Sequence, residues 1–191
     1  MNTILHVFVE GIYDIKFFKD FIEKSDCLPI SIKQPDGSSI DYNEIVYYKY
    51  RDLSKNEIVE ALKTIKEQNT DYIVITDKDF KDKQQRKNEV VKPYSFDVNK
   101  TWLVSNVIEG WYLAGFNDSF CNRGDVRIKY KGSNTEKISK PEFKRIARKI
   151  RKTEVQLINF LSIRKSEFSF EEAKKRNQSL AKFYNHFGLK C

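Results

Sequence analysis

Five carboxylate side chains of this 191-residue chain follow apolar segments closely enough to share one site. They are Glu10, Asp14, Asp77, Asp79 and Glu109. Two unit charges about 4 Å apart repel each other by about 4 kcal/mol at an effective dielectric constant of about 20, so carboxylates gathered in one crevice need a cation. Oxygen ligands without Cys or His favour Mg²⁺ or Mn²⁺. The five residues therefore predict a site for a hard divalent ion.

Each of these residues, taken alone, also has a structural explanation. Asp14 would lie at the third position of a helix, where the helix dipole favours a carboxylate. Asn106 and Glu109 have the spacing of a capping box. The acidic pair Asp77 and Asp79 would suit a turn, and Glu10 would suit a solvated strand end. The prediction of a site therefore depends on the five residues occurring together.

The segments around these residues alternate between strand and helix patterns. The expected strands are Ile4–Val9, Ile45–Tyr50, Tyr72–Ile75 and Thr101–Val104, and the expected helices are Ile12–Lys24, Ser54 to about Ile65, Val107–Phe116, Lys140–Arg151 and Phe170–Phe187. Such alternation predicts an α/β fold, a mainly parallel sheet flanked by helices with a C-terminal helical extension. In such a sheet the ligand crevice lies beyond the carboxyl ends of the strands, where all five carboxylates are expected. The polar stretch Lys81–Asn99 predicts a surface loop, and Pro35-Asp36-Gly37 predicts a turn.

The positive charge of the chain is concentrated in one block. The formal net charge is +8, and Arg123 to Lys152 hold 12 basic and 3 acidic side chains. A helix beginning near Lys140 would bury an apolar stripe and direct its basic residues outward; these are Lys144, Arg145, Arg148, Lys149 and Arg151. Lys81, Lys83, Arg86 and Lys87 would form a second basic wall. Such side chains suit a nucleic-acid backbone, and a merely solvated face is the alternative.

Composition excludes several other classes of protein. The apolar runs are far shorter than the ~20 residues that cross a bilayer, so no membrane partner is expected. The first residues lack the features of a signal peptide, and three scattered cysteines suit a reducing compartment, so a cytoplasmic location is expected. Two histidines and no cysteine pair at ligand spacing make a zinc site improbable.

Three segments resemble the successive motifs of Toprim domains, the metal-binding fold of topoisomerases, bacterial-type primases, a ribosomal-RNA maturation nuclease and the OLD-family nucleases. They are Val9–Phe18, Ile75–Phe80 and Ile108–Ala114. The Glu-Gly-x-x-Asp form at Glu10 and the later Glu109 look more like OLD-type and small stand-alone members. The resemblance covers Ile4 to about Gly115, and Arg176–Phe183 is similar, less specifically, to the closing helix of some stand-alone members.

This resemblance implies a nuclease that hydrolyses phosphodiester bonds of DNA or RNA with one or two Mg²⁺ or Mn²⁺ ions. Glu10 would be a general acid/base or a metal ligand, Asp77 and Asp79 would be ligands, and Asp14 and Glu109 would permit a second ion. Residues 1–118 would form the Toprim-like catalytic domain, and 119–191 a basic helical extension packing on it. No Gly-x-x-x-x-Gly-Lys-Ser/Thr sequence is present, so a requirement for a separate ATPase or another protein partner stays open.

Two other functions are compatible with the sequence. One is a nucleic-acid-binding module whose acidic site is non-catalytic or regulatory. The other is a haloacid-dehalogenase-like phosphatase, which also places Asp-x-Asp after an apolar strand. That fold needs a later lysine and a second acidic pair after a strand, whereas Glu171-Glu172 lies at an expected helix start, so this function ranks last. The sequence does not distinguish DNA from RNA or single strands from duplexes.

Overall fold

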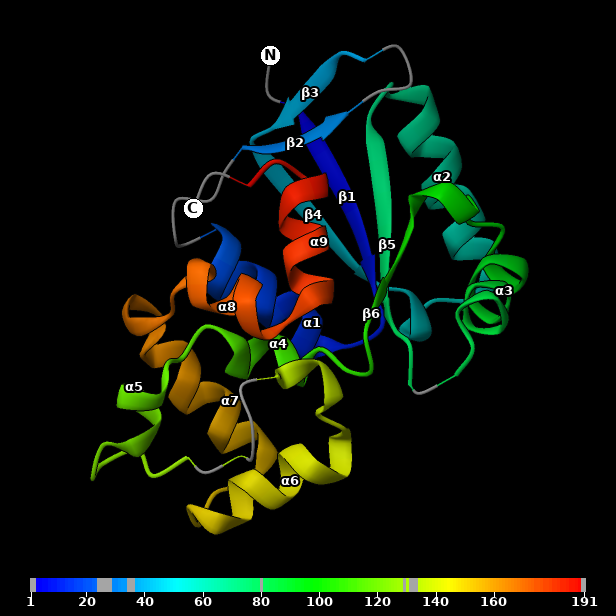
Figure 1. The fold of residues 1–191 in the computed structure, drawn as a ribbon. Helices are drawn as coiled ribbons and strands as arrows, with labels where there is room; N and C mark the ends of the chain where they lie inside the picture. Colours follow the sequence, from blue (N-terminus) through cyan, green and yellow to red (C-terminus); the bar gives the residue numbers. More distant parts are fainter. Residues whose placement is uncertain are drawn as a thin grey trace.

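Four parallel strands form the central sheet of the protein (Figure 1). The computed structural model describes residues 3–23, 29–33, 37–79, 81–128, 130 and 134–189. The sheet has the order β4-β1-β5-β6, built from β1 Ile4–Val9, β4 Glu44–Lys49, β5 Asp71–Asp77 and β6 Thr101–Val104. A separate antiparallel pair, β2 Ile30–Lys33 and β3 Ser39–Tyr42, was not expected. The α/β fold and the four predicted strands are confirmed.

The register brings the carboxyl ends of the strands to one edge. Val9, the last residue of β1, lies beside Lys49 of β4 and Ile75 of β5, and Asp77 at the end of β5 lies beside Val104 of β6. Since all these pairs are parallel, the loops that follow the strands leave the sheet on the same side. That side is the lower one in Figure 1.

Helices cover both faces of the sheet and form the C-terminal extension. The α-helices are α1 Ile12–Phe17, α2 Lys55–Glu67, α3 Lys83–Tyr94, α4 Glu109–Ala114, α5 Asp118–Asn122, α6 Lys140–Lys149, α7 Glu154–Ile163, α8 Phe170–Arg176 and α9 Gln178–His186. A π-helical segment η1, Phe18–Ile22, continues α1, and short 3₁₀ segments are η3 Tyr50–Asp52, η4 Val98–Lys100, η5 Thr135–Lys137 and η6 Lys165–Glu167. No helix of the described ranges is long and apolar enough to cross a membrane.

Two hydrophobic clusters attach these helices to the sheet. Phe8 of β1 lies on the face of the sheet that α2 and α3 cover. There it belongs to one cluster with Ile58 of α2 and Val90 of α3. Its neighbours on β1 alternate to the other face, so Val9 belongs to a larger cluster that also contains Phe143 of α6. This larger cluster includes residues from both the N-terminal and the C-terminal part of the chain. The boundary proposed at residue 118 stays a prediction.

The surface loop predicted over Lys81–Asn99 is wrong, because α3 occupies most of it. The Asp82 side chain caps the helix by accepting from the backbone N–H groups of Gln84 and Gln85. Pro93 falls in the last turn, where the helix is about to end. The buried side chains of α3 are Arg86 and Val90, four residues apart. Because one of them is an arginine, no apolar periodicity marked the helix.

The C-terminal helices differ in detail from the prediction. The helix expected over Phe170–Phe187 is two helices, because Asn177 adopts extended backbone angles and its side chain accepts from the Leu180 N–H to cap α9. Helix α7 was missed, and α4 begins at Glu109 instead of Val107. Lys24, Pro35 and Asp36, which belonged to the expected helix end and turn, lie outside the described residues.

Candidate active site

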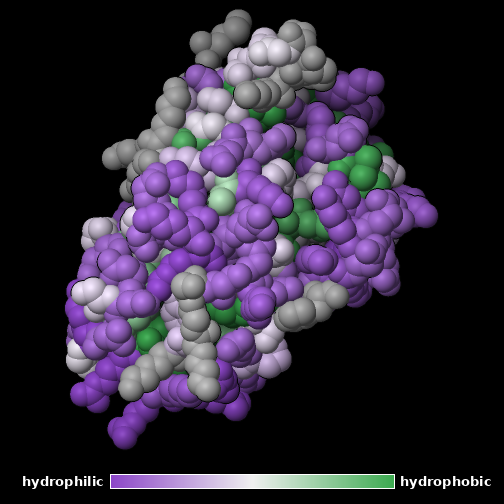
Figure 2. Space-filling view, viewed as in Figure 1, coloured by the Kyte–Doolittle hydropathy of each residue, from purple (hydrophilic) through white to green (hydrophobic). Residues whose placement is uncertain are grey.

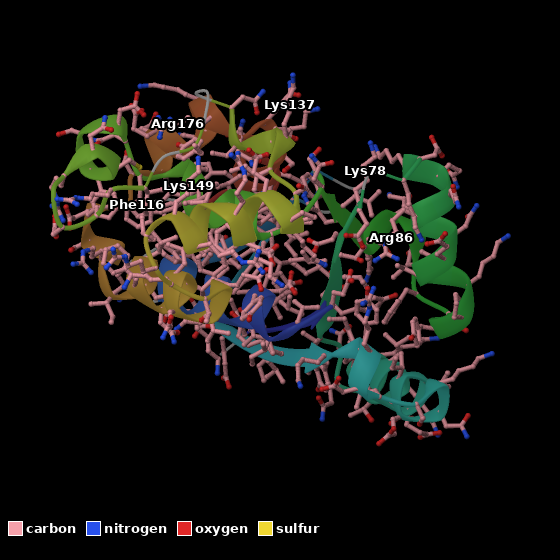
Figure 3. All side chains as sticks on the ribbon, turned by 90° about the horizontal axis from the view of Figure 1, so that it is seen from below. Lys78, Arg86, Phe116, Lys137, Lys149 and Arg176 are labelled. Carbon is pink, nitrogen blue, oxygen red and sulfur yellow. The ribbon has the colours of Figure 1, made fainter. Side chains whose placement is uncertain are left out.

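The five predicted carboxylates belong to the segments that meet at the carboxyl edge of the sheet. Glu10 follows β1 directly, Asp14 lies in α1, Asp77 ends β5, Asp79 follows two residues later, and Glu109 begins α4. Figure 3 views the molecule from this side, with Lys78 and Arg86 close to the edge. Glu10, Asp14, Asp77 and Glu109 are 8% exposed or less, whereas the Asp79 side chain is 31% exposed. The structure therefore gathers four buried carboxylates and one at the rim.

Burial and mutual repulsion make these carboxyl groups hard to ionise. Burial, followed by the charges of Glu10 and Glu109, raises the pKa of Asp14 to about 7. Burial, followed by the charges of Asp14 and Glu109, raises the pKa of Asp77 well above its ordinary value. Burial also raises the pKa of Glu109. Such shifts are typical of functional sites, where an ion or a substrate compensates the charge.

Lys140 supplies a positive charge to this site, although it was not among the residues predicted from the sequence. Its Nζ lies 3.3 Å from Asp77 Oδ2 and 3.7 Å from Asp79 Oδ1. Partial burial would lower the pKa of the Lys140 amine, but the carboxylates of Asp77 and Asp79 outweigh that effect and raise it. Lys140 is the first residue of α6, which the Ser139 side chain caps. Nothing in its local sequence distinguishes it from the neighbouring lysines.

Glu10 is held by two arginines instead of facing the other carboxylates alone. Arg86 Nη2 lies 2.7 Å from Glu10 Oε2, and Arg51 forms an ion pair with Oε1. The Thr76 hydroxyl donates to the same Oε2 at 2.7 Å. Arg86 Nε also donates to the backbone carbonyl of Asp77 at 2.7 Å. The prediction that Arg86 is an exposed nucleic-acid contact is therefore wrong: the residue is 6% exposed and ties α3 to the ends of β1 and β5.

The loops after β5 and β6 are fixed to each other by backbone bonds. Asp79 has a φ of 52°, and its N–H donates to the carbonyl of Asn106 at 3.0 Å. Asn106 itself has a φ of 57° and donates its side-chain amide to the Glu136 carbonyl. Left-handed angles at residues other than glycine are uncommon and cluster at functional sites. The capping box predicted for Asn106 and Glu109 is wrong, since Ile108 precedes α4 and its N–H donates to Asp77 Oδ1 at 2.8 Å.

The remaining predicted basic residues lie on two separate elements. On α3, Lys81 just before the helix pairs with Glu89, Lys87 donates to the Val98 carbonyl, and Lys83 is exposed. The outward residues of α6 and its end are exposed as expected: Lys144, Arg145, Arg148, Lys149 and Arg151. Helix α6 thus starts at the acidic site with Lys140 and leads away from it, and Figure 3 places Lys149 well apart from Lys78 and Arg86. Hydrophilic residues cover most of the face seen in Figure 2.

The donor set of the site fits a hard divalent ion. Three buried carboxylate oxygens of the site, Glu10 Oε1, Asp14 Oδ1 and Glu109 Oε2, have no hydrogen-bond partner within the described part of the chain. Glu10 Oε1 is in an ion pair with Arg51, whereas Asp14 Oδ1 and Glu109 Oε2 are in no ion pair there. Carboxylate oxygens are the ligands that Mg²⁺ and Mn²⁺ take. In the described ranges, however, no three acidic, His or Cys side chains already converge on one point. Arg86, the Ile108 N–H and Lys140 hold the carboxylates in their present positions, so an ion would require Lys140 to withdraw from Asp77.

Comparison of the chain with models of protein families, with curated proteins and with solved structures finds no match. The acidic site combines crowded buried carboxylates, which attract cations, with Lys140 and the basic face of α6, which attract anions. A site of this kind can hold a metal ion and a phosphate group side by side.

Proposed function

We propose that this protein is a Mg²⁺- or Mn²⁺-dependent nuclease that hydrolyses phosphodiester bonds of DNA or RNA, as Toprim proteins resembling the OLD type do. The observation that carries the proposal is the group of buried carboxylates with raised pKa values and two unpartnered oxygens, at the sheet edge where Lys140 begins a basic helix. Burial of this much like charge without a bound cation is unfavourable.

The residues have different roles in the proposed site. Asp14, Asp77 and Glu109 would hold the ion, because they are buried and repel one another. Asp79, at the rim, would hold a second ion or a metal-bound water. The bound ion would activate a water and stabilise the leaving oxygen. Lys140 would move from Asp77 to a phosphate oxygen of the substrate when the ion binds.

Glu10 fits a positioning role better than that of a free ligand. Its two oxygens are engaged by Arg86 and Arg51, and the Arg51 side chain is 51% exposed. A phosphate approaching the site would compete for Arg51 and would free one oxygen of Glu10. Glu10 would act as general acid/base only after that exchange.

The test is cleavage of a labelled panel of supercoiled DNA, single strands, ribosomal RNA and tRNA with Mg²⁺, Mn²⁺ or a chelator. Asp77→Asn keeps an oxygen for the Ile108 N–H but removes the charge, and it should lower the cleavage rate at least 100-fold. Glu171→Gln removes a surface carboxylate on α8 and should cleave like wild type. Wild-type cleavage by Asp77→Asn, or cleavage that persists in the chelator, would contradict the proposal.

A second candidate, a nucleic-acid-binding module without turnover, is favoured by one observation. Lys140 already compensates part of the charge of Asp77 and Asp79 without any ion. The melting temperature separates the candidates without an activity assay. Millimolar Mg²⁺ should raise it for wild type and not for Asp77→Asn if the site holds a metal. If the protein binds nucleic acid without cleaving it, and Mg²⁺ does not change its melting temperature, the binding module without turnover is the better description.

A further inference from the structure

A groove runs along the outer edge of β6, the last strand in the order of the described sheet, outside the acidic site. One pocket of about 330 Å³ lies between α3, β6 and α9, and a second of about 300 Å³ adjoins it toward the start of the strand. The two share the lining residues Asn99, Thr101, Trp102 and His186, so they form one continuous groove. Figure 1 shows β6 on the near side of the sheet, between α9 and α3.

The larger pocket of the groove carries an excess of positive charge, whereas the smaller one is lined by Asp71, Asp97 and Lys100. The larger pocket is lined by four lysines, Lys78, Lys83, Lys87 and Lys182. Within the described ranges, no carboxylate pairs with Lys78, Lys83 or Lys182, whereas Lys81 and Lys140 nearby are paired. Glu136 also lines this pocket, but its carboxylate accepts from the Ser179 N–H. Partial burial and the neighbouring charge of Lys83 lower the pKa of Lys87. Like charges gathered in this way favour an anionic ligand.

An aromatic surface lies beside these lysines. Trp102 lines both pockets and is half-buried, and its ring centroid lies 5.2 Å from that of His186 with the planes 31° apart. Its Nε1 has no hydrogen-bond partner among the described residues. A basic groove with an aromatic platform is the arrangement by which proteins bind single-stranded nucleic acid. A duplex keeps its base faces stacked inside, so an unpaired base suits this groove better.

The groove opens next to the acidic site. Lys78 stands between Asp77 and Asp79 in the chain and lines the pocket. Ser105 and Glu136 also line this pocket. Ser105 directly precedes Asn106, and the Glu136 carbonyl accepts from the Asn106 side chain. The Asn106 carbonyl in turn accepts from the Asp79 N–H. A chain of nucleotides lying along β6 would therefore reach the carboxylates with its next phosphodiester bonds.

We propose that the groove along β6 binds a single-stranded segment of nucleic acid, with one unpaired base against Trp102 and adjacent phosphates on Lys83, Lys87 and Lys182. The inference extends the proposed function by naming the strandedness of the substrate. Its cleavage consequence rests on that function, whereas binding in the groove is measurable without cleavage.

The test is the affinity for labelled 12-nucleotide single strands of DNA and RNA, measured by anisotropy in a chelator so that no cleavage occurs. Lys83→Ala with Lys182→Ala should weaken binding and reduce the magnitude of the log–log salt slope by about 1.4, since each lost single-strand contact contributes about 0.7. Lys63→Ala with Lys66→Ala, two exposed lysines of α2, is the matched control and should bind like wild type.

Trp102 gives an independent measurement. Stacking on an aromatic ring contributes about 1–3 kcal/mol per base, so Trp102→Leu should weaken single-strand binding by about 5- to 150-fold, whereas Trp102→Phe should retain most of it. Binding should also quench the indole emission of wild type, and Trp102→Phe should lose that quenching because Trp111 is buried. Affinity for a duplex of the same sequence should change little in Trp102→Leu.

The outcomes separate this inference from the proposed function. Wild-type single-strand affinity in both the double lysine variant and Trp102→Leu would overturn the proposed binding in the groove, even if Asp77→Asn abolishes cleavage. Weakened binding in these variants, together with wild-type cleavage by Asp77→Asn, would support the groove and contradict the catalytic site. Quenching by an acidic peptide that adds to the β6 edge, and not by oligonucleotides, would assign the groove to a protein partner and overturn the inference.

Discussion

At the scale of single residues, Arg86 is the side chain on which the arrangement of the acidic edge depends most directly. It bonds to the carboxylate of Glu10, the hydroxyl of Thr76 and the carbonyl of Asp77, and so joins α3 to two strands. Arg86 and Glu10 side chains are each 7% exposed. A buried charge that loses its partner is strongly destabilising, because neither water nor another group replaces the pair.

Arg86→Ala should therefore lower the free energy of unfolding by about 3–5 kcal/mol, because it leaves Glu10 buried without this partner. Arg51→Ala removes the other ion pair of the same carboxylate, but the Arg51 side chain is half-exposed, so its loss should cost about 1 kcal/mol or less. Urea denaturation of the two variants and wild type measures the difference. Equal losses in the two variants would show that burial of the pair is unimportant.

Asp14 predicts a dependence of stability on pH in the metal-free protein. Its pKa is raised from 3.8 to about 7 in the folded state, so between these values the folded protein binds a proton that the unfolded chain has released. Stability from this group is fully present below about pH 4 and falls as the pH rises toward about 7. Asp14→Asn should flatten that fall, because the asparagine does not titrate.

The free energy of unfolding at pH 5 and pH 8 in a chelator measures this effect as a difference between wild type and Asp14→Asn. Burial lowers the pKa of His6, so this residue makes stability rise with pH up to about 6.5 and opposes the effect of Asp14. Because His6 is present in both proteins, its effect cancels in the difference between them. Mg²⁺ at pH 8 should recover stability in wild type more than in the variant. Parallel pH profiles for the two proteins would place the pKa of Asp14 near its ordinary value.

The acidic residues of the site were predictable from sequence, while their basic partners were not. Glu10 and Asp77 end apolar strands, and parallel strands place such positions at one edge. Arg86 and Lys140 come from helices whose approach to that edge depends on packing. A lysine or arginine within a basic segment gives no local sign that it points inward.

Among the elements, α6 presents the basic face that is proposed to contact a nucleic-acid backbone. Lys140 at its start contacts Asp77, and its exposed Lys144 and Arg148 lie one and two turns further along the helix. Lys144→Ala with Arg148→Ala should reduce the log–log salt slope of duplex binding by about 1.8 and weaken binding equally for all sequences. Anisotropy at several salt concentrations measures the slope, with Lys63→Ala and Lys66→Ala as control. An unchanged slope would show that Lys144 and Arg148 do not contact phosphates and that the phosphates bind another face.

Elements with an apolar period were predicted well, and those held by polar contacts were not. The strands β1, β5 and β6 are apolar runs and were found close to their observed bounds. Helix α3 is held by the Asp82 cap and by side-chain bonds such as Gln85 to Glu89. The break between α8 and α9 depends on the backbone angles of Asn177. Neither the polar contacts of α3 nor the backbone angles of Asn177 leave a trace in hydrophobic periodicity.

At the scale of the whole molecule, the two basic surfaces adjoin the carboxylates from different elements. The groove along β6 meets the site at Lys78, and α6 meets it at Lys140. A substrate with an unpaired end and a paired body would engage both surfaces at once. The fold class followed from the alternation of strands and helices, but the strand order β4-β1-β5-β6 did not, because only tertiary pairing determines it.

The position of β1 between two neighbouring strands also affects how the chain folds while it is being synthesised. Ile4 pairs with Glu44 and Leu5 with Asp71, so β1 leaves the ribosome before both of its neighbouring strands. Translation at about 5–20 residues per second leaves that apolar strand unpaired for several seconds. His6 is its one polar residue, and no charge interrupts it. Nascent chains of this protein should therefore need protection by chaperones until Asp77 has emerged, when β1 is enclosed on both sides.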